Sequence, residues 1–458
     1  MKRKPFIRIA SGQGFWGDLQ RAPLDQIRLA SSESPVHYLM LDYLAEVTMS
    51  IMQKQRQKDP SLGYARDFPI VIGELLPMLR EKGIKVISNA GGVNPLACRD
   101  QIFSIAKKHG IKGLKIGVVY GDDIAASISD LIQNGETFNN MDNGEALEPY
   151  LSKVQSANVY FGAAPIAKCL EAGADIVVTG RCTDTGLTLA PMMYEFGWKS
   201  DDWNLLAAGT VAGHLLECGG QASGGNFLGD WESVPNLENI GFPIAEMYPN
   251  GEFFVTKHPG TGGLVSSAVL KEQLLYEIGN PTEYITPDVV ADFTSIHLQD
   301  VAENRVRVYG ISGKPATPFY KVSIAFSNGW YTFGSLTYAF PEPLKKAKRA
   351  DEILRARLKN LGLEFEEIRT EYIGASACHH HLEDIQAVNE VQMRIGVYDR
   401  DKSKIERFGY EIAPLILTGP PSVTGFAGGR PKPSEVVAYW GALMKKDKIE
   451  PKTDVQEI

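Results

Sequence analysis

The chain has no run of apolar residues long enough to cross a bilayer, since a spanning helix needs about 20 of them. Its first residues, MKRKPFIRIASGQ, are basic, but Arg8 interrupts the apolar run before it reaches the length of a signal peptide. A long basic run is also missing, and 47 Lys and Arg against 55 Asp and Glu give a net charge of −8. We therefore expect neither a membrane nor a nucleic acid as the main partner.

Cysteine is scarce as well. The five cysteines are scattered and odd in number, which is typical of a reducing compartment rather than of a disulfide framework. With 44% hydrophobic and 22% charged residues, the composition is that of an ordinary globular protein, and 458 residues suffice for two or three domains. We expect a cytoplasmic protein with a large core and, because most soluble assemblies are symmetric, a homo-oligomer.

Apolar, β-branched stretches alternate with amphipathic ones along the first 200 residues. The predicted strands are residues 6–10, 36–42, 85–89, 115–120, 157–162 and 175–180, and helices are predicted between them, for example at 69–82, 95–109 and 185–196. This alternation predicts an α/β fold with a parallel sheet and right-handed crossovers. A doubly wound open sheet is the first choice, and a (β/α) barrel is the alternative.

The pattern changes near residue 285. Successive strands are predicted from 290 to 340, with turns at Glu303-Asn304 and at 327–329, followed by a charged helix at 342–362 and a further strand at 365–374. We therefore predict an α/β domain at 1–285 and an antiparallel α+β domain at 286–458. The polar tail from residue 445 is expected to fray.

Residues 211–229, VAGHLLECGGQASGGNFLG, are the strongest candidate for a site. A helix end would explain one glycine pair, but here two pairs are interleaved with polar side chains, and glycine lets backbone approach a ligand closely. The polar and glycine residues concerned are His214, Glu217, Gly219, Gly220, Gln221, Gly224, Gly225 and Asn226.

Polar residues also follow the predicted strands, and in a parallel sheet these positions meet at one edge. For proton transfer we select His214, Glu217, Asp184, Asp42 and Glu46, because histidine and carboxylates serve as general acids and bases. Arg181 and Lys257 are predicted anion clamps, and glycine-rich loops add backbone donors. The remaining predicted substrate-binding residues are Cys182, Asn89, Gly91, Gly92, Asn94, Glu246, Thr261, Gly262 and Gly263.

Two further motifs indicate other chemistry. Gly12, Gly14 and Gly17 match G-x-G-x-x-G, and Asp42 closes the next strand, as in a dinucleotide-binding fingerprint. Pro23, however, marks a helix start well after the glycines. Cys378 and the histidines at 379–381 carry zinc-ligand chemistry, but neighbouring strand residues point to opposite faces, so no metal site is predicted.

Several segments together resemble the acyclic terpene utilisation protein AtuA family. They include DYLAEVTM (42–49), SNAGGVNP (88–95), GRCTDTGLTLAP (180–191), GHLLECGGQASGGNF (213–227), GFPIAE (241–246), TKHPGTGGLVS (256–266) and QLLYEIGNP (273–281). The resemblance runs from about residue 8 to about 440. It implies a setting in bacterial catabolism of acyclic terpenes through branched acyl-CoA thioesters, and it names no reaction.

Three functions follow as hypotheses. The first is a catabolic enzyme acting on a small or branched carboxylic acid or its CoA thioester, as a hydro-lyase or isomerase. The second is a non-catalytic ligand-binding or assembly subunit for a carboxylase or hydratase, with the loops at 313–319 and 418–433 as interface elements. The third is a dinucleotide-dependent oxidoreductase. No cofactor is identified, and a divalent metal is compatible with the carboxylates.

Overall fold

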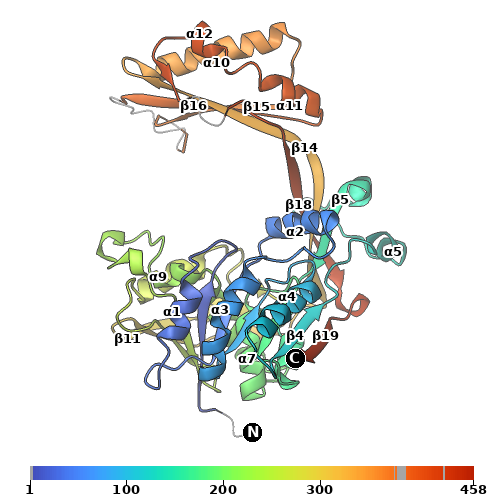
Figure 1. Cartoon of the computed structure of the whole chain (residues 1–458), viewed down its shortest axis with the longest axis vertical. Helices are drawn as coiled ribbons and strands as arrows, with labels where there is room; N and C mark the ends of the chain where they lie inside the picture. The colour runs from blue at the N-terminus through green and yellow to red at the C-terminus, as the bar shows by residue number, and fades with distance from the viewer. Residues whose placement is uncertain (1–3, 376, 379–387, 426–428) are drawn as a thin grey trace. The chain divides into compact units, whose positions relative to one another are not determined.

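The computed structural model describes residues 4–375, 377–378, 388–425 and 429–458 (Figure 1). The chain forms two compact units. Unit 1 contains the residues up to Ala325 together with Tyr439–Ile458, and unit 2 contains Phe326–Ala438. The units therefore divide elsewhere than at residue 285, where only the strand pattern changes.

A ten-stranded mixed sheet forms the centre of unit 1. Its middle strands run parallel in the order β1 (Ile7–Gln13), β2 (Tyr38–Leu41), β3 (Lys85–Ser88), β6 (Ile176–Thr179) and β4 (Lys115–Tyr120). Antiparallel strands extend it beyond β1 as β7 (Ile244–Met247), β8 (Phe253–Thr256), β12 (Arg305–Tyr309) and β11 (His297–Ala302). At the other end, β19 (Lys452–Glu457) pairs antiparallel with β4.

This topology corrects two expectations. The sheet ends at β11 and β19, so in the described residues it is open, and the (β/α) barrel is wrong. The sheet is also mixed rather than all parallel, because short connections such as the one between β7 and β8 cannot carry the crossover that parallel strands need.

The predicted strand at 157–162 and the predicted frayed tail are corrected together. The strand β5 (Val154–Val159) pairs with β14, not with the parallel sheet. Both edges of β4 are already occupied, by β6 on one side and by β19 on the other. The tail forms a strand because the edge of β4 that faces away from β6 has backbone groups that need hydrogen-bond partners, and β19 provides them.

Helices connect the parallel strands, and α3 shows why they form. It starts with Pro69 in its first turn and ends at Gly83, whose φ of 64° favours glycine. Ile72, Leu76 and Leu79 recur at helical spacing and are buried. The helices of unit 1 are α1 (Ala22–Arg28), α2 (Glu46–Lys58), α3 (Phe68–Lys82), α4 (Pro95–Lys108), α5 (Ile128–Gln133), α6 (Ala164–Glu171), α7 (Gly186–Phe196), α8 (Trp203–Glu217) and α9 (Ser267–Leu275).

The first four helices contribute to a hydrophobic core cluster of unit 1. Figure 1 shows α1, α3 and α4 side by side over the strands, and their apolar faces join a cluster with β1, β2 and β3. Leu39, Val86 and Ile102 lie in this cluster with no exposed surface. At about 25 cal/mol per Å² of apolar surface, this burial stabilises the packing of these helices on the sheet.

The remaining strands are antiparallel. A three-stranded sheet contains β9 (Tyr284–Ile285), β10 (Val290–Asp292) and β13 (Ser312–Lys314). In the second sheet, β14 (Phe319–Ala339) pairs with β16 (Glu390–Asp399), β17 (Val423–Thr424) and β18 (Ser434–Lys445), and β15 (Glu367–Ile373) pairs with β16. The helices of unit 2 are α10 (Pro343–Asn360), α11 (Lys402–Phe408) and α12 (Leu415–Thr418).

One predicted turn is right and one is wrong. Glu303 and Asn304 join β11 to β12, with Asn304 at a φ of 52°, as the sequence predicts. Residues 327–329, by contrast, lie inside the continuous strand β14, where Gly329 takes a φ of 91° and accommodates a local irregularity without a reversal. No helix in the described part of the chain is long and apolar enough to cross a membrane.

Candidate functional site

A cavity of about 430 Å³ lies in unit 1, beside the carboxyl ends of β1, β2 and β6 and the C-terminal end of α8. It is lined by Gly14, Phe15, Asp42, Leu44, Ala45, Arg181, Asp184, Glu217, Cys218, Gln221, Tyr276 and Glu277. Open α/β sheets bind ligands at this edge, because the strands end there and their connecting loops diverge. A larger hollow of about 800 Å³ in unit 2, lined by Phe340, Leu344 and Val388 among others, contains none of the predicted site residues.

The buried side chain of His214 stands behind Glu217. Both lie in the last turn of α8, three residues apart and so on one face of the helix. The Nε2 atom of His214 is 2.9 Å from the backbone oxygen of Gln273, and its Nδ1 is 2.8 Å from Oε1 of Glu217. Since a carbonyl oxygen only accepts, Nε2 carries a hydrogen.

The pair therefore shares one proton between Nδ1 of His214 and Oε1 of Glu217. Either an imidazolium faces a carboxylate, or a neutral imidazole accepts from a carboxylic acid. Burial opposes the imidazolium, but the charge and hydrogen bond of Glu217, together with the hydrogen bond to Gln273 and the charge of Glu277, outweigh it and raise the pKa of His214. Of the two side chains, only that of Glu217 lines the cavity. His214 is thus a positioning residue, and Glu217 is the group that a ligand would meet.

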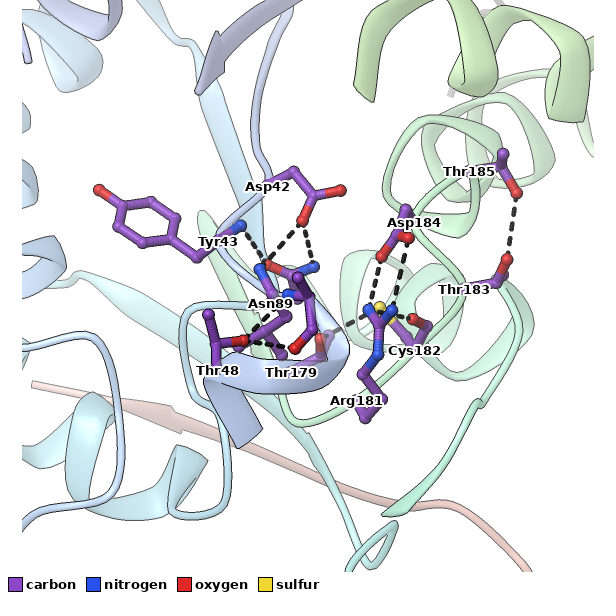
Figure 2. Close-up of polar contacts among 12 residues, drawn as sticks. Asp42, Tyr43, Thr48, Asn89, Thr179, Arg181, Cys182, Thr183, Asp184 and Thr185 are labelled. Atoms are coloured by element: carbon purple, nitrogen blue, oxygen red, sulfur yellow. Dashed lines mark hydrogen bonds and ion pairs between the residues drawn. The ribbon is translucent and has the colours of Figure 1, made fainter. Parts of the chain in front are cut away.

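Asp42 follows β2 directly and is held by Asn89 after β3. Figure 2 shows this contact, in which Nδ2 of Asn89 donates to Oδ1 of Asp42 at 2.7 Å. The same Oδ1 accepts from the backbone N–H of Leu44, and Oδ1 of Asn89 accepts from that of Tyr43. Both hydrogen bonds that described residues make to Asp42 go to Oδ1, so Oδ2 is the atom available to a ligand.

Arg181 and Asp184 form the third part of the wall, in the loop between β6 and α7. Nη1 of Arg181 lies 2.5 Å from Oδ1 of Asp184, and Figure 2 shows the two side chains facing each other. The same Nη1 donates to the backbone oxygen of Cys182, and the guanidinium stacks 4.1 Å from the ring centre of Tyr160. The positive charge of Arg181 is therefore paired with the carboxylate of Asp184 in the same chain.

Burial and neighbouring carboxyl groups raise the pKa of Asp42 and of Glu217. For Asp42, burial and the charge of Asp184 raise the pKa well above its usual range, against the hydrogen bond from Asn89 and the charge of Arg181. For Glu217, burial raises the pKa against the charge and hydrogen bond of His214, and Asp184 and Glu277 add to the increase. Two carboxyl groups at one cavity are thereby shifted toward the protonation behaviour of general acids.

The structure places some of the predicted site residues around this cavity and others elsewhere. Gly14, Asp42, Arg181, Asp184, Glu217 and Gln221 line the cavity. His214 and Asn89 support it from behind, and Cys182 is buried 3.4 Å from the hydroxyl of Thr179. Glu46 begins α2, and its side chain lies outside the described part of the structure.

The two glycine pairs, Gly219-Gly220 and Gly224-Gly225, do not line the main cavity. Gln221, Gly225 and Asn226 line an adjoining hollow of about 80 Å³, which shares Gln221 and Tyr276 with the main cavity. Gly219, with a φ of 55°, and Gly220 form the 3-10 turn η2 (Gly219–Ser223) against Phe242, and Gly224 lies close to Val234 and Leu264. Gly219, Gly220 and Gly224 thus leave room mainly for neighbouring side chains, and Gly225 lies against the backbone of Gly220.

Other predicted ligand-binding residues serve the fold at a distance from the cavity. Nζ of Lys257 donates to the backbone oxygen of Thr261, and Nδ2 of Asn94 donates to the backbone oxygens of Pro60 and Leu62. Glu246 accepts from Tyr248 and pairs with Arg305 on the sheet. The four glycines Gly91, Gly92, Gly262 and Gly263 stand where an added Cβ would meet neighbouring atoms. These residues line neither of the two adjoining hollows.

The glycines of the dinucleotide motif do not begin a helix. Gly12 lies inside β1 against Leu39 and Leu41, and Gly14 touches the backbone of Cys218. The backbone N–H of Gly14 donates to Asp18, and α1 starts only at Ala22. A dinucleotide fingerprint needs a helix N-terminus facing the pyrophosphate, and this loop does not supply one.

Sequence reasoning missed two residues of the wall that follow α9, Tyr276 and Glu277. Glu277 has a φ of 54°, which is rare for a residue other than glycine and often marks a functional position. A signal existed, because both residues belong to the segment QLLYEIGNP that contributes to the family resemblance. Cys218, which sequence reasoning did not select, also lines the cavity, and burial raises its pKa to about 12.

No group of three or more His, Cys, Asp or Glu residues with metal-binding geometry occurs in the described residues. Cys378 is exposed, and the histidines at 379–381 lie outside the described residues.

Comparison with known proteins gives one match. The model of a family described as acyclic terpene utilisation family protein AtuA matches residues 7–455, which is nearly the whole chain. No curated protein and no solved structure matches the chain significantly.

Proposed function

Because the chain belongs to the acyclic terpene utilisation AtuA family, we propose that it is a catabolic enzyme that transfers protons on a branched acid or its CoA thioester. Membership of the family suggests a role in acyclic terpene utilisation. The reaction class we propose is that of a hydro-lyase or an isomerase, since both remove a proton from carbon and return one elsewhere.

The observation that carries this proposal is the pair of carboxyl groups with raised pKa at one cavity. A general acid or base works best when its pKa lies near the working pH, and burial moves Asp42 and Glu217 in that direction. The cavity volume of about 430 Å³ also falls within the usual range for small-molecule sites, about 300–1,000 Å³.

Each residue then has a distinct role. Glu217, as the carboxylate, takes the proton from substrate carbon and becomes a carboxylic acid, and His214 holds Oε1 and favours the carboxylate before that transfer. Asp42, with Oδ2 toward the ligand, donates to the oxygen or carbon on the other side of the substrate. The amide of Gln221 binds a substrate carbonyl, and the Arg181–Asp184 pair keeps the wall in place.

A solvent-exchange experiment tests the proposal. The purified protein is incubated in D₂O with CoA thioesters of branched acids and with the free acids, and mass spectrometry follows deuterium incorporation. We expect exchange in at least one thioester, and a loss of about 100-fold or more in Glu217→Gln, which cannot act as a base. The matched control is Glu252→Gln, because Glu252 pairs with Arg307 on the sheet and does not line the cavity.

Exchange that proceeds equally in Glu217→Gln would refute the assignment of the base. No exchange with any of these compounds would refute the enzyme hypothesis and favour a ligand-binding subunit.

A further inference from the structure

The cavity carries an excess of negative charge. Asp42, Asp184, Glu217 and Glu277 line it, and among the lining residues Arg181 is the one cation. Counting Asp42 and Glu217 as protonated still leaves two carboxylates, those of Asp184 and Glu277, against one guanidinium. An anion that enters therefore meets net repulsion in a partly desolvated site, where charges interact more strongly than in water.

Arg181 does not remove this repulsion. Its guanidinium is 2% exposed, contacts Asp184 at 2.5 Å, donates to the backbone oxygen of Cys182 and stacks on Tyr160. A substrate carboxylate would have to displace Asp184 from its charge-assisted contact, and a carboxylate without its partner would remain in the wall.

The other predicted anion clamp is placed elsewhere. Lys257 binds Thr261 in the turn after β8 and does not line the cavity. The uncharged part of the wall comes from Phe15, Leu44, Ala45 and Tyr276, and Tyr276 continues into the adjoining hollow with Phe227 and Val269. The available surface thus fits an apolar chain that ends in an uncharged oxygen group able to accept or donate hydrogen bonds.

We infer that the part of the substrate that enters this cavity is uncharged, as in an acyl thioester, an alcohol or an aldehyde, and that a free carboxylate is excluded. The inference rests on the proposed function for the branched skeleton of the substrate, and it selects the thioester over the free acid. A substrate acid must then be supplied by a reaction that activates it as a thioester.

Matched ligand pairs test this inference without turnover. Isothermal titration calorimetry at neutral pH compares isovaleramide with isovalerate, octanamide with octanoate, and the uncharged N-acetylcysteamine thioesters of the same acids. An amide and a carboxylate of one skeleton have nearly the same shape and differ in charge. We expect the amides and thioesters to bind at least about tenfold more tightly than the carboxylates.

Two variants identify the source of the selectivity. In Asp184→Asn, Arg181 loses its ionised partner, so the preference for the amide should fall by about tenfold or reverse. In Glu277→Gln, the change is at an exposed residue that leaves the fold intact, and the preference should fall by a smaller factor. Glu252→Gln should leave it unchanged. Circular dichroism and thermal melting check that each variant is folded.

The inference is overturned if the wild-type protein binds carboxylates as tightly as amides, if it binds neither, or if the folded Asp184→Asn and Glu277→Gln variants keep the full preference. These outcomes are separate from those of the exchange experiment. Preferential binding of uncharged ligands without any deuterium exchange would refute the proposed catalysis and leave the selectivity intact. Deuterium exchange in free acids, together with tight binding of carboxylates, would refute the selectivity and leave the proposed catalysis intact.

Discussion

At the scale of single residues, His214 shows how burial changes a role assigned from sequence. The sequence identifies it as an acid or base in contact with substrate, but it is 1% exposed and lies between Glu217, Gln273 and the rings of Tyr284 and Phe293. Its effect on chemistry must therefore pass through Glu217. Replacing it also leaves the backbone oxygen of Gln273 without its ring partner, so folding is affected together with activity.

We expect His214→Ala to lower the free energy of unfolding by about 1–3 kcal/mol, because buried polar partners lose their hydrogen bonds. We also expect a change in the pH profile of deuterium exchange. The charge and hydrogen bond of His214 lower the pKa of Glu217, so their loss raises it. Glu217 then loses its proton at higher pH, and the acidic limb of the profile moves upward. An unchanged limb in a folded variant would show that His214 contributes only to packing.

At the scale of elements, the cavity depends on how closely the end of α8 approaches the loop after β1. An ideal Cβ at Gly14 would lie 2.7 Å from the carbonyl carbon of Cys218 and 2.9 Å from the nitrogen of Gly219. Both are backbone atoms at the helix end, which cannot rotate away as a side chain does. Glycine at position 14 belongs to the sequence that resembles a dinucleotide motif, but the close contact between two chain segments explains why glycine is required there.

We therefore expect Gly14→Ala to destabilise the protein by about 1–3 kcal/mol, since the added methyl group overpacks the contact. Ligand binding should weaken as well, because Glu217 and Gln221 lie on either side of Cys218 and Gly219 and would move with them. Urea denaturation and calorimetry measure the two effects. Gly279→Ala is the matched control, since a Cβ there meets no atom within 4 Å and no unusual φ is required. Equal stability of the two variants would contradict the close contact.

At the scale of the whole molecule, all the residues that line the cavity belong to unit 1. Unit 2 has a hydrophobic core of its own, in which Leu336, Leu354, Met393 and Phe408 have no exposed surface. The strands β14 and β18, which lead into unit 2 and out of it, pair with each other. Unit 2 is therefore an insertion between two strands that remain joined by hydrogen bonds without it.

We expect that replacing residues 327–437 by a short Gly-Ser linker leaves unit 1 folded and able to bind the uncharged ligands within about threefold of the full-length affinity. Circular dichroism, melting and calorimetry test this on the shortened chain. A control in which the same linker is inserted beside the exposed Gly144, which does not line the cavity, with unit 2 retained, separates the effect of the linker from that of the deletion. Loss of binding in a folded, shortened protein would place a ligand-binding element in unit 2.

The sequence by itself determined the alternation of strands and helices, since hydrophobic periodicity is local. It also placed Asp42, Arg181 and Asp184 near one edge, because residues that follow parallel strands end there. The family resemblance drew attention to the segment with Tyr276 and Glu277, although not to their role in the wall.

Only the tertiary structure decided which polar residues meet and which bind their own turns, as Lys257 and Asn94 do. It also decided that β19 takes the edge of β4 and that β5 pairs with β14. These outcomes depend on which strand lies against a backbone edge in the folded chain and on which side of a loop a side chain points. Both are properties of distant parts of the chain, and no local pattern of residues encodes them.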